Sequence, residues 1–122
     1  MPSLEQVTAW IDGYVDAWNS NRPQDIGRLF SKDATYYTAP HREPWRGREG
    51  IVESWLARKD EPGQTSFTWK PLVITDDLAI VQGETVYREP PTTYSNLWVI
   101  RMDASGHCTE FTEWWMDQGT TA

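Results

Sequence analysis

The segment FTEWWMDQ, residues 111–118, places one carboxylate among bulky aromatic side chains. Successive side chains of a β-strand point to opposite faces, so Phe111, Glu113 and Trp115 would share one face. A carboxylate that faces an apolar cavity loses hydration, which raises its pKa toward values that suit a general acid or base. Glu113 is therefore the leading candidate for proton-transfer chemistry. If the alternation slips by one residue, Glu113 faces solvent instead and has no distinctive role.

The two histidines are further groups that titrate near neutral pH. His41 lies in the segment APHREPWR, residues 39–46, and its ordinary pKa of about 6.5 would let it exchange protons. The alternative is an ordinary loop residue. His107 falls at an expected turn. Neither histidine has a second ligand at HxxxH or HxH spacing, so we expect no metal site.

The sequence contains none of the common motifs that bind a cofactor or activate a nucleophile. It has no Ser-His-Asp order, CxxC pair or dinucleotide fingerprint. The segment GREG, residues 47–50, lacks the glycine-lysine pair of a phosphate loop. We therefore expect no cofactor, and any chemistry must come from a few side chains in an aromatic surrounding.

The composition indicates one acidic domain spanning residues 1–122. Eighteen acidic and eleven basic residues give a net charge of −7, and eight residues are tryptophan. The acidic balance disfavours binding to nucleic acid. No segment approaches the ~18 apolar residues of a membrane helix, and the N-terminus lacks a secretory signal, so we expect a soluble, cytoplasmic protein without a membrane partner. The single cysteine, Cys108, should pack as a small apolar group.

Helices are predicted first along the chain. Ser3 and Gln6 match a capping box, and apolar residues then recur every three or four positions, which predicts a helix over about residues 4–20. Pro23 suits the first turn of a second, short helix. A short strand at 34–38 and an irregular loop at 39–46 should precede a third helix over about residues 47–59.

The remainder of the chain is rich in strand patterns, at residues 65–75, 78–88, 94–102 and 107–117. Short turns between these segments predict an antiparallel meander. Helices followed by strands indicate an α+β domain, with N-terminal helices packed on a curved antiparallel sheet.

Five segments carry a resemblance to a known family: VTAWIDGYVDAWN, the stretch from Pro23 to Phe30, LFSKDATYY, WRGREGIVESW and LWVIRMDASGHCTEFTEWWMD. Their order and spacing resemble the SnoaL-like and ketosteroid isomerase-like members of the nuclear transport factor 2-like superfamily. The resemblance spans nearly the whole chain. It implies a cone-shaped α+β barrel in which a bent sheet wraps around the helices and leaves a pocket at the open end.

The resemblance also implies which side chains reach that pocket. The implied ligand-binding residues are Trp18, Tyr37, Trp55, Tyr87, Asn96, Trp98, Phe111 and Trp115. Tyr14 matches the family's oxyanion-binding phenol, and the alternative is a core tyrosine. Where the family has its proton-shuttling aspartate, this chain has Thr38 or Ala39, and Trp98 replaces the assisting acid. Steroid isomerisation is therefore not expected.

Two functional interpretations follow. In the first, the pocket binds a small apolar, cyclic or aromatic molecule and acts as a cofactor-free isomerase, cyclase or hydrolase, with Glu113, Tyr14 and His41 as catalytic groups. In the second, the domain is non-catalytic and its aromatic residues build only a core and a dimer face. Trp114 and Met116 would point outward and form an apolar patch, which predicts a homodimer.

Overall fold

Helix α1 (Leu4–Ser20) confirms the helix that the apolar spacing predicts. In this computed structural model, which describes residues 2–61 and 63–119, the capping box is complete. The Ser3 hydroxyl accepts the Gln6 backbone N–H at 3.1 Å, and the Gln6 side-chain oxygen accepts the Ser3 N–H at 2.9 Å. These bonds satisfy two of the N–H groups that a helix start leaves free. The buried side chains of α1 are Val7, Trp10, Ile11, Tyr14 and Ala17.

Two shorter helices, α2 (Pro23–Gly27) and α3 (Gly47–Ala57), follow. Pro23 opens α2, as expected from its fixed φ and missing N–H. Helix α3 ends at Ala57 and is two residues shorter than its prediction, so Arg58 caps the helix and Lys59 lies beyond it. Both basic side chains are exposed.

The strands are β1 (Phe30–Tyr37), β2 (Trp45–Arg46), β3 (Thr65–Thr75), β4 (Leu78–Tyr87), β5 (Thr92–Met102) and β6 (Cys108–Asp117). They form one sheet in the order β2-β1-β6-β5-β4-β3. The antiparallel meander from β3 to β6 is confirmed. The sheet as a whole is mixed, because β1 pairs with β6 in parallel. The loop expected at 39–46 ends in β2, which pairs with β1 through Tyr36 and Trp45.

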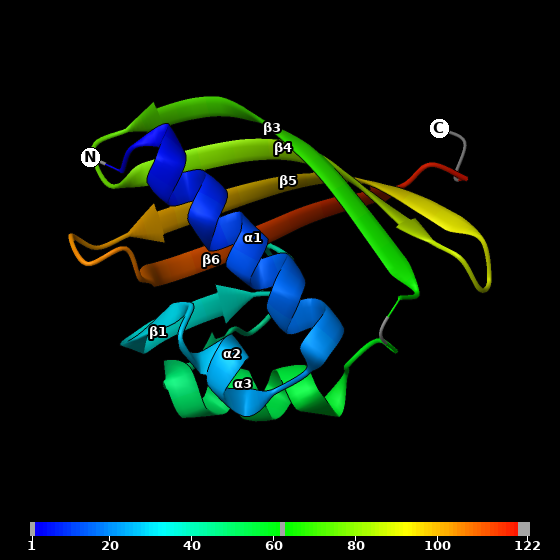
Figure 1. The fold of residues 1–122 in the computed structure, drawn as a ribbon, viewed down its shortest axis with the longest axis horizontal. Coiled ribbons are helices and arrows are strands. Elements are labelled where there is room, and N and C mark those ends of the chain that lie inside the picture. The colour runs from blue at the N-terminus through cyan, green and yellow to red at the C-terminus, as the bar shows by residue number, and fades with distance from the viewer. Residues whose placement is uncertain (1, 62, 120–122) are drawn as a thin grey trace.

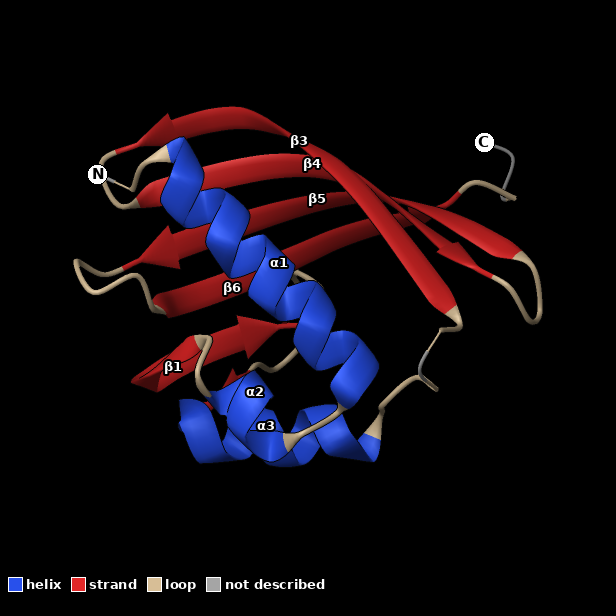
Figure 2. Cartoon of the chain, viewed as in Figure 1, coloured by secondary structure: helices blue, strands red, loops and turns tan. Residues whose placement is uncertain are grey.

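The fold is α+β, with helices packed against a curved sheet that does not close. Figure 1 shows α1 crossing the inner face of β3 to β6, with α2 and α3 beside β1. Figure 2 shows the same separation of helices and strands by colour. The core lies between these layers: the ring of Trp10 packs against Tyr14, Phe30 and Phe111, with centroids 5.6, 6.0 and 5.9 Å away.

A glycine on β4 makes room for an aromatic stack on the inner face. Gly83 pairs with Trp69 on β3, and a Cβ at Gly83 would collide with the Phe67 ring. The Phe67 ring instead lies flat against Trp98, with centroids 4.4 Å apart and an interplanar angle of 11°. The absent side chain at Gly83 therefore helps to fix the position of Trp98.

The outer face of the sheet carries exposed apolar side chains. Trp114 is 51% exposed and Met116 is 69% exposed. Trp114 pairs with Leu97 on β5, so apolar groups of neighbouring strands are adjacent. Within the described ranges, no helix is long and apolar enough to cross a membrane.

Candidate functional site

A cavity of about 330 Å³ opens among the helices and the inner face of the sheet. Glu113 and Tyr14, two of the side chains expected to act chemically, line it. Of the residues expected to contact a ligand, six line it: Trp18, Trp55, Tyr87, Asn96, Trp98 and Trp115. Strand alternation accounts for the members on β5 and β6, because Asn96 and Trp98 lie two apart on β5, as do Glu113 and Trp115 on β6.

The carboxylate of Glu113 is held by two donors from the neighbouring strand. Its Oε2 accepts the Trp98 indole N–H at 2.7 Å and the Asn96 amide N–H at 2.8 Å. The Asn96 carbonyl oxygen accepts the Thr85 hydroxyl at 2.7 Å, which orients the amide with its nitrogen toward Glu113. Among the described residues no protein donor reaches Oε1 of Glu113. That oxygen is therefore available to a molecule in the cavity.

Burial raises the pKa of Glu113 to about 7, from an ordinary value of 4.5. The hydrogen bonds from Trp98 and Asn96 act in the opposite direction, because they stabilise the charged form. Desolvation outweighs them, so Glu113 exchanges its proton close to neutral pH. This is the range in which a general acid or base is most effective.

A pair of tyrosines contributes hydrogen-bonding hydroxyls to the cavity. The Tyr14 and Tyr36 hydroxyl oxygens lie 2.6 Å apart, and either can donate to the other. Burial raises the pKa of both phenols, so both keep their protons at neutral pH. Two O–H groups then share one mutual hydrogen bond, which leaves one O–H free to donate to a ligand.

Asp60 forms a second polar group on the cavity wall. Its Oδ2 accepts the Trp18 indole N–H at 2.7 Å and the Tyr87 hydroxyl at 3.3 Å. Its backbone carbonyl accepts the Asn21 amide at 2.9 Å. These bonds tie the segment after α3 to α1 and β4. Burial, followed by the charge of Asp60, raises the pKa of Tyr87.

Residues 11–112 match the SnoaL-like domain family. This match covers most of the chain and agrees with the helix and sheet order described above. The chain belongs to the SnoaL-like family. No curated protein matches it.

Solved structures share the fold of this SnoaL-like domain. A candidate ketosteroid isomerase from Kribbella flavida has 18% identity and a TM-score of 0.71, over 97% of this chain and 83% of that one. A ketosteroid isomerase-like protein from Erwinia carotovora has 17% identity and a TM-score of 0.66, over 93% of this chain and 95% of that one. An NTF2-like protein of unknown function from Mesorhizobium loti has 16% identity and a TM-score of 0.68, over 95% of this chain and 97% of that one. At these identities the likeness shows the fold alone.

Three residues that we expected at the pocket of the SnoaL-like domain do not line it. Tyr36 takes the place expected for Tyr37, because Tyr36 pairs with Phe111 across β1 and β6 and so shares its inward face. Phe111 is fully buried behind the wall, against Tyr14 and Tyr36. His41 is exposed in the loop after β1, and the neighbouring Arg42 reaches the cavity instead.

Sequence reasoning missed several lining residues. Asp60 follows a helix end, where no periodic pattern indicates the direction of a side chain. Arg42 lies in a loop, and its guanidinium carbon sits 5.8 Å from the centre of the Trp115 ring. The Trp115 indole N–H donates to the carbonyl oxygen of Thr38 at 3.2 Å.

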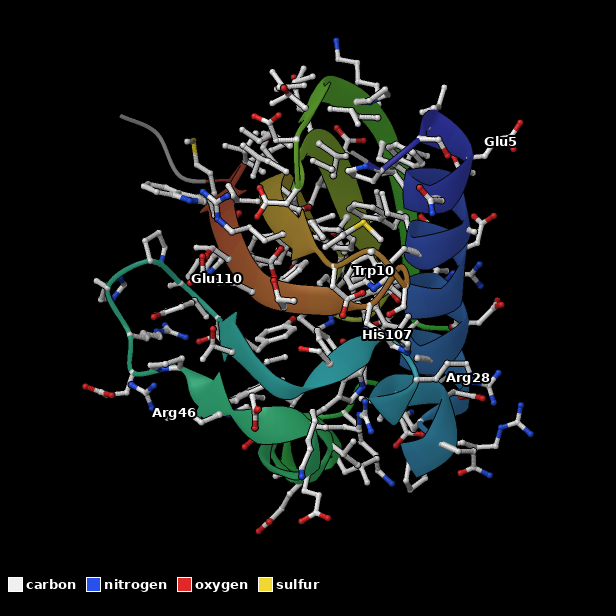
Figure 3. All side chains as sticks on the ribbon, turned by 90° about the vertical axis from the view of Figure 1, so that its left-hand side faces the viewer. Glu5, Trp10, Arg28, Arg46, His107 and Glu110 are labelled. Atoms are coloured by element: carbon white, nitrogen blue, oxygen red, sulfur yellow. The ribbon has the colours of Figure 1, made fainter. Side chains whose placement is uncertain are left out.

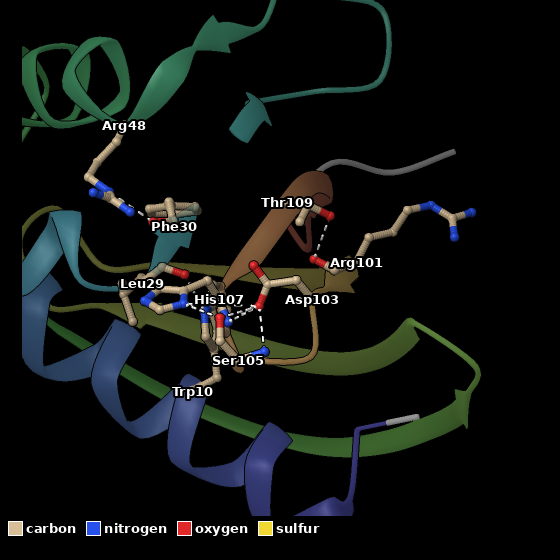
Figure 4. A network of polar contacts seen from close by, with 9 residues as sticks. All are labelled: Trp10, Leu29, Phe30, Arg48, Arg101, Asp103, Ser105, His107 and Thr109. Atoms are coloured by element: carbon tan, nitrogen blue, oxygen red, sulfur yellow. Dashed lines mark hydrogen bonds and ion pairs between the residues drawn. The ribbon is translucent and has the colours of Figure 1, made fainter. Parts of the chain in front are cut away.

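The other histidine lies outside this cavity. His107 and Arg28 line a shallow depression beside α2, and Figure 3 shows both at that end of the molecule. Figure 4 shows the turn before β6, in which Asp103 accepts backbone N–H groups from Ser105 and His107 at 3.0 Å. Within residues 2–61 and 63–119, no three His, Cys, Asp or Glu side chains are grouped to hold a metal ion. Cys108 is fully buried, and burial raises the pKa of its thiol.

Proposed function

We propose that this SnoaL-like domain binds a small cyclic molecule in its aromatic cavity and exchanges a proton with it through Glu113, without a cofactor. The observation that carries this proposal is the position of Glu113 on the cavity wall, where Trp98 and Asn96 hold its Oε2 and burial raises its pKa to about 7. Carboxylates with strongly perturbed pKa values in a cavity are common at functional sites.

The walls of the cavity suit a flat, largely apolar molecule. The rings of Trp18, Trp55, Trp98 and Trp115 line it, and about 330 Å³ is enough for a bicyclic or tricyclic compound. Aromatic walls bury a ring with little loss of side-chain freedom, and they also exclude water from the reacting groups. Polar side chains, among them Glu113, Asn96 and Asp60, also line the cavity and would orient the molecule.

The geometry supports transfer of a proton from a carbon next to a carbonyl group. Ionised Glu113 would take the proton on Oε1, while Trp98 and Asn96 hold Oε2 in place. The electron pair of the broken C–H bond moves onto the carbonyl oxygen. The free O–H of the Tyr14 and Tyr36 pair would donate to that oxygen. Return of the proton to another carbon gives an isomer, and attack of the carbanion on a second carbonyl gives a ring.

A general probe of carbon acids tests this proposal. In 5-nitrobenzisoxazole a base removes the ring C–H proton, the N–O bond breaks, and a coloured phenolate forms. We expect the protein to accelerate this opening, with a rate that rises as Glu113 ionises around pH 7. Glu113→Gln keeps the shape of the side chain but cannot accept the proton, so its rate should fall at least about a hundredfold. A wild-type rate no higher than that of Glu113→Gln contradicts the proposal.

We also propose that two copies of the domain associate through the outer face of the sheet. The exposure of Trp114 and Met116 supports this second proposal, because water-exposed apolar groups gain free energy when a partner covers them. Binding in the cavity does not depend on it, since the cavity lies on the inner face. The cytoplasmic location stays a prediction.

A further inference from the structure

The mouth of the cavity gathers positive charge in a protein that is otherwise acidic. Three basic residues line the cavity: Arg42, Arg58 and Lys59. The acidic residues that line it are two, Asp60 and Glu113. The whole chain has eighteen acidic and eleven basic residues. All three basic side chains are exposed, so their charged ends lie at the opening and not among the inner rings. The local balance of charge is therefore opposite in sign to that of the chain.

No acidic side chain in the described part of the chain forms an ion pair with these cations. Within the described ranges, the ion pairs involve Arg22, Arg28, Arg46, Arg101 and His107, and none involves Arg42, Arg58 or Lys59. Asp60 is adjacent in sequence to Lys59, yet its Oδ2 accepts hydrogen bonds from Trp18 and Tyr87. The positive charge at the mouth is thus available to a ligand.

Arg42 is placed for recognition by its contact with Trp115. Its guanidinium carbon lies 5.8 Å from the ring centre, within the range of a cation–π interaction. Trp115 itself is fixed by its hydrogen bond to Thr38 at 3.2 Å. A planar guanidinium held in this way can donate two parallel hydrogen bonds to a carboxylate or phosphate.

We infer that the ligand of this cavity is a cyclic organic anion, with its ring among the tryptophans and its carboxylate or phosphate at the mouth beside Arg42 and Arg58. This inference rests on the proposed binding function and adds the charge and orientation of the ligand. The opposite orientation would bring the anion to Glu113, where like charges repel. A mouth of one sign also attracts an anion from solution.

Three naphthalene probes with the same ring test the inference by calorimetry: 2-naphthoate, 2-naphthyl phosphate and the neutral 2-naphthamide. At pH 6, below the pKa of Glu113, at least one anion should bind about tenfold more tightly than the amide. The tighter of the two anions identifies the preferred headgroup. Roughly 0.5 M salt should remove most of the advantage, because screening weakens exposed charge pairs.

Variants of the basic residues test where the anionic group of the probe binds. The double variant Arg42→Gln with Arg58→Gln should bind the anions no better than the amide. Lys70→Gln removes a positive charge from an exposed site on β3 outside the cavity and should leave all three affinities unchanged. The amide should bind equally to all variants.

Three results would overturn the inference, and they differ in what else they overturn. If 2-naphthamide binds as tightly as both anions, the cavity accepts rings without regard to charge, and only the inference fails. If none of the three probes binds, the proposed binding function fails as well. An anion preference that survives in the double variant but is lost in Lys70→Gln would place the anion elsewhere on the surface.

Discussion

Trp98 and Glu113 face each other across β5 and β6, and the Trp98 indole N–H donates to Oε2 of Glu113 at 2.7 Å. The pair lies on the inner face of the sheet, where burial raises the pKa of the carboxyl group although this bond lowers it. Burial and this hydrogen bond thus act on the pKa in opposite directions: loss of water favours the neutral acid, and the indole N–H stabilises the anion. Because the first effect is larger, Glu113 titrates near neutral pH.

Glu113→Gln should remove a pH dependence from the stability of the fold. The folded pKa, about 7, exceeds the ordinary 4.5, so the fold favours the protonated form. The contribution of Glu113 to stability is therefore complete below pH 4.5 and declines as the pH rises to about 7. Neutral glutamine shows no such decline. As the pH rises from 4.5 to 8, the free energy of unfolding of the variant should increase relative to that of the wild type by up to about 3 kcal/mol.

Urea unfolding of both proteins across this pH range measures the change. Glutamine can still accept from Trp98 and Asn96 through its side-chain carbonyl, so the variant should fold. A stability difference that stays constant from pH 4.5 to 8 would mean that Glu113 is solvated.

Gly83→Ala should destabilise the protein by about 1–3 kcal/mol. The added Cβ would collide with the Phe67 ring, and Phe67 stacks on Trp98. The matched control is Gly50→Ala in α3, where a Cβ meets nothing within 4 Å. That change should stabilise the helix by up to about 1 kcal/mol. Thermal unfolding measures the stability of both variants. Equal changes in stability would refute the close approach of Phe67 to Gly83.

Tyr14 and Tyr36 should be energetically coupled. Each phenylalanine substitution removes the same hydrogen bond between the two hydroxyls, worth about 1 kcal/mol. The double variant Tyr14→Phe with Tyr36→Phe loses that bond only once. The loss of unfolding free energy in the double variant should therefore be about 1 kcal/mol smaller than the sum of the losses in the two single variants. A double-mutant cycle from urea unfolding measures this coupling, and strict additivity would show that the bond is absent.

Trp114→Arg should weaken self-association without disturbing the cavity. A charge placed on the outer face at this position must lose its hydration when a second copy covers it, which costs free energy. Sedimentation velocity should show a shift from dimer toward monomer. Leu4→Arg changes another exposed apolar residue, 54% exposed at the start of α1, and should leave the mass unchanged. A Trp114→Arg protein that stays dimeric would exclude this face as the interface.

Strong periodic patterns made much of this architecture predictable. The capping box and apolar spacing fix α1, and alternation along β5 and β6 brings Asn96, Trp98 and Glu113 to one face. These are properties of a local period, which a sequence displays directly. The parallel pairing of β1 with β6 depends on contacts between distant segments, and no local pattern specifies it.

The same reasoning explains the errors at the site. Tyr36 and Tyr37 are adjacent and identical, so only the pairing of Tyr36 with Phe111 determines which one faces inward. Asp60 is positioned by hydrogen bonds from Trp18 and Tyr87, which lie 42 and 27 residues away in the chain. Side chains in loops and at helix ends have no period from which to read their direction.

The titration of Glu113 itself is the most direct test of the proposed site. In protein labelled with ¹³C at glutamate side chains, the Glu113 carboxyl signal can be assigned by its loss in Glu113→Gln. Its chemical shift should change with a midpoint near pH 7. A midpoint near the ordinary value of 4.5 would show a carboxylate in contact with bulk water, and the proposed proton transfer would have no base.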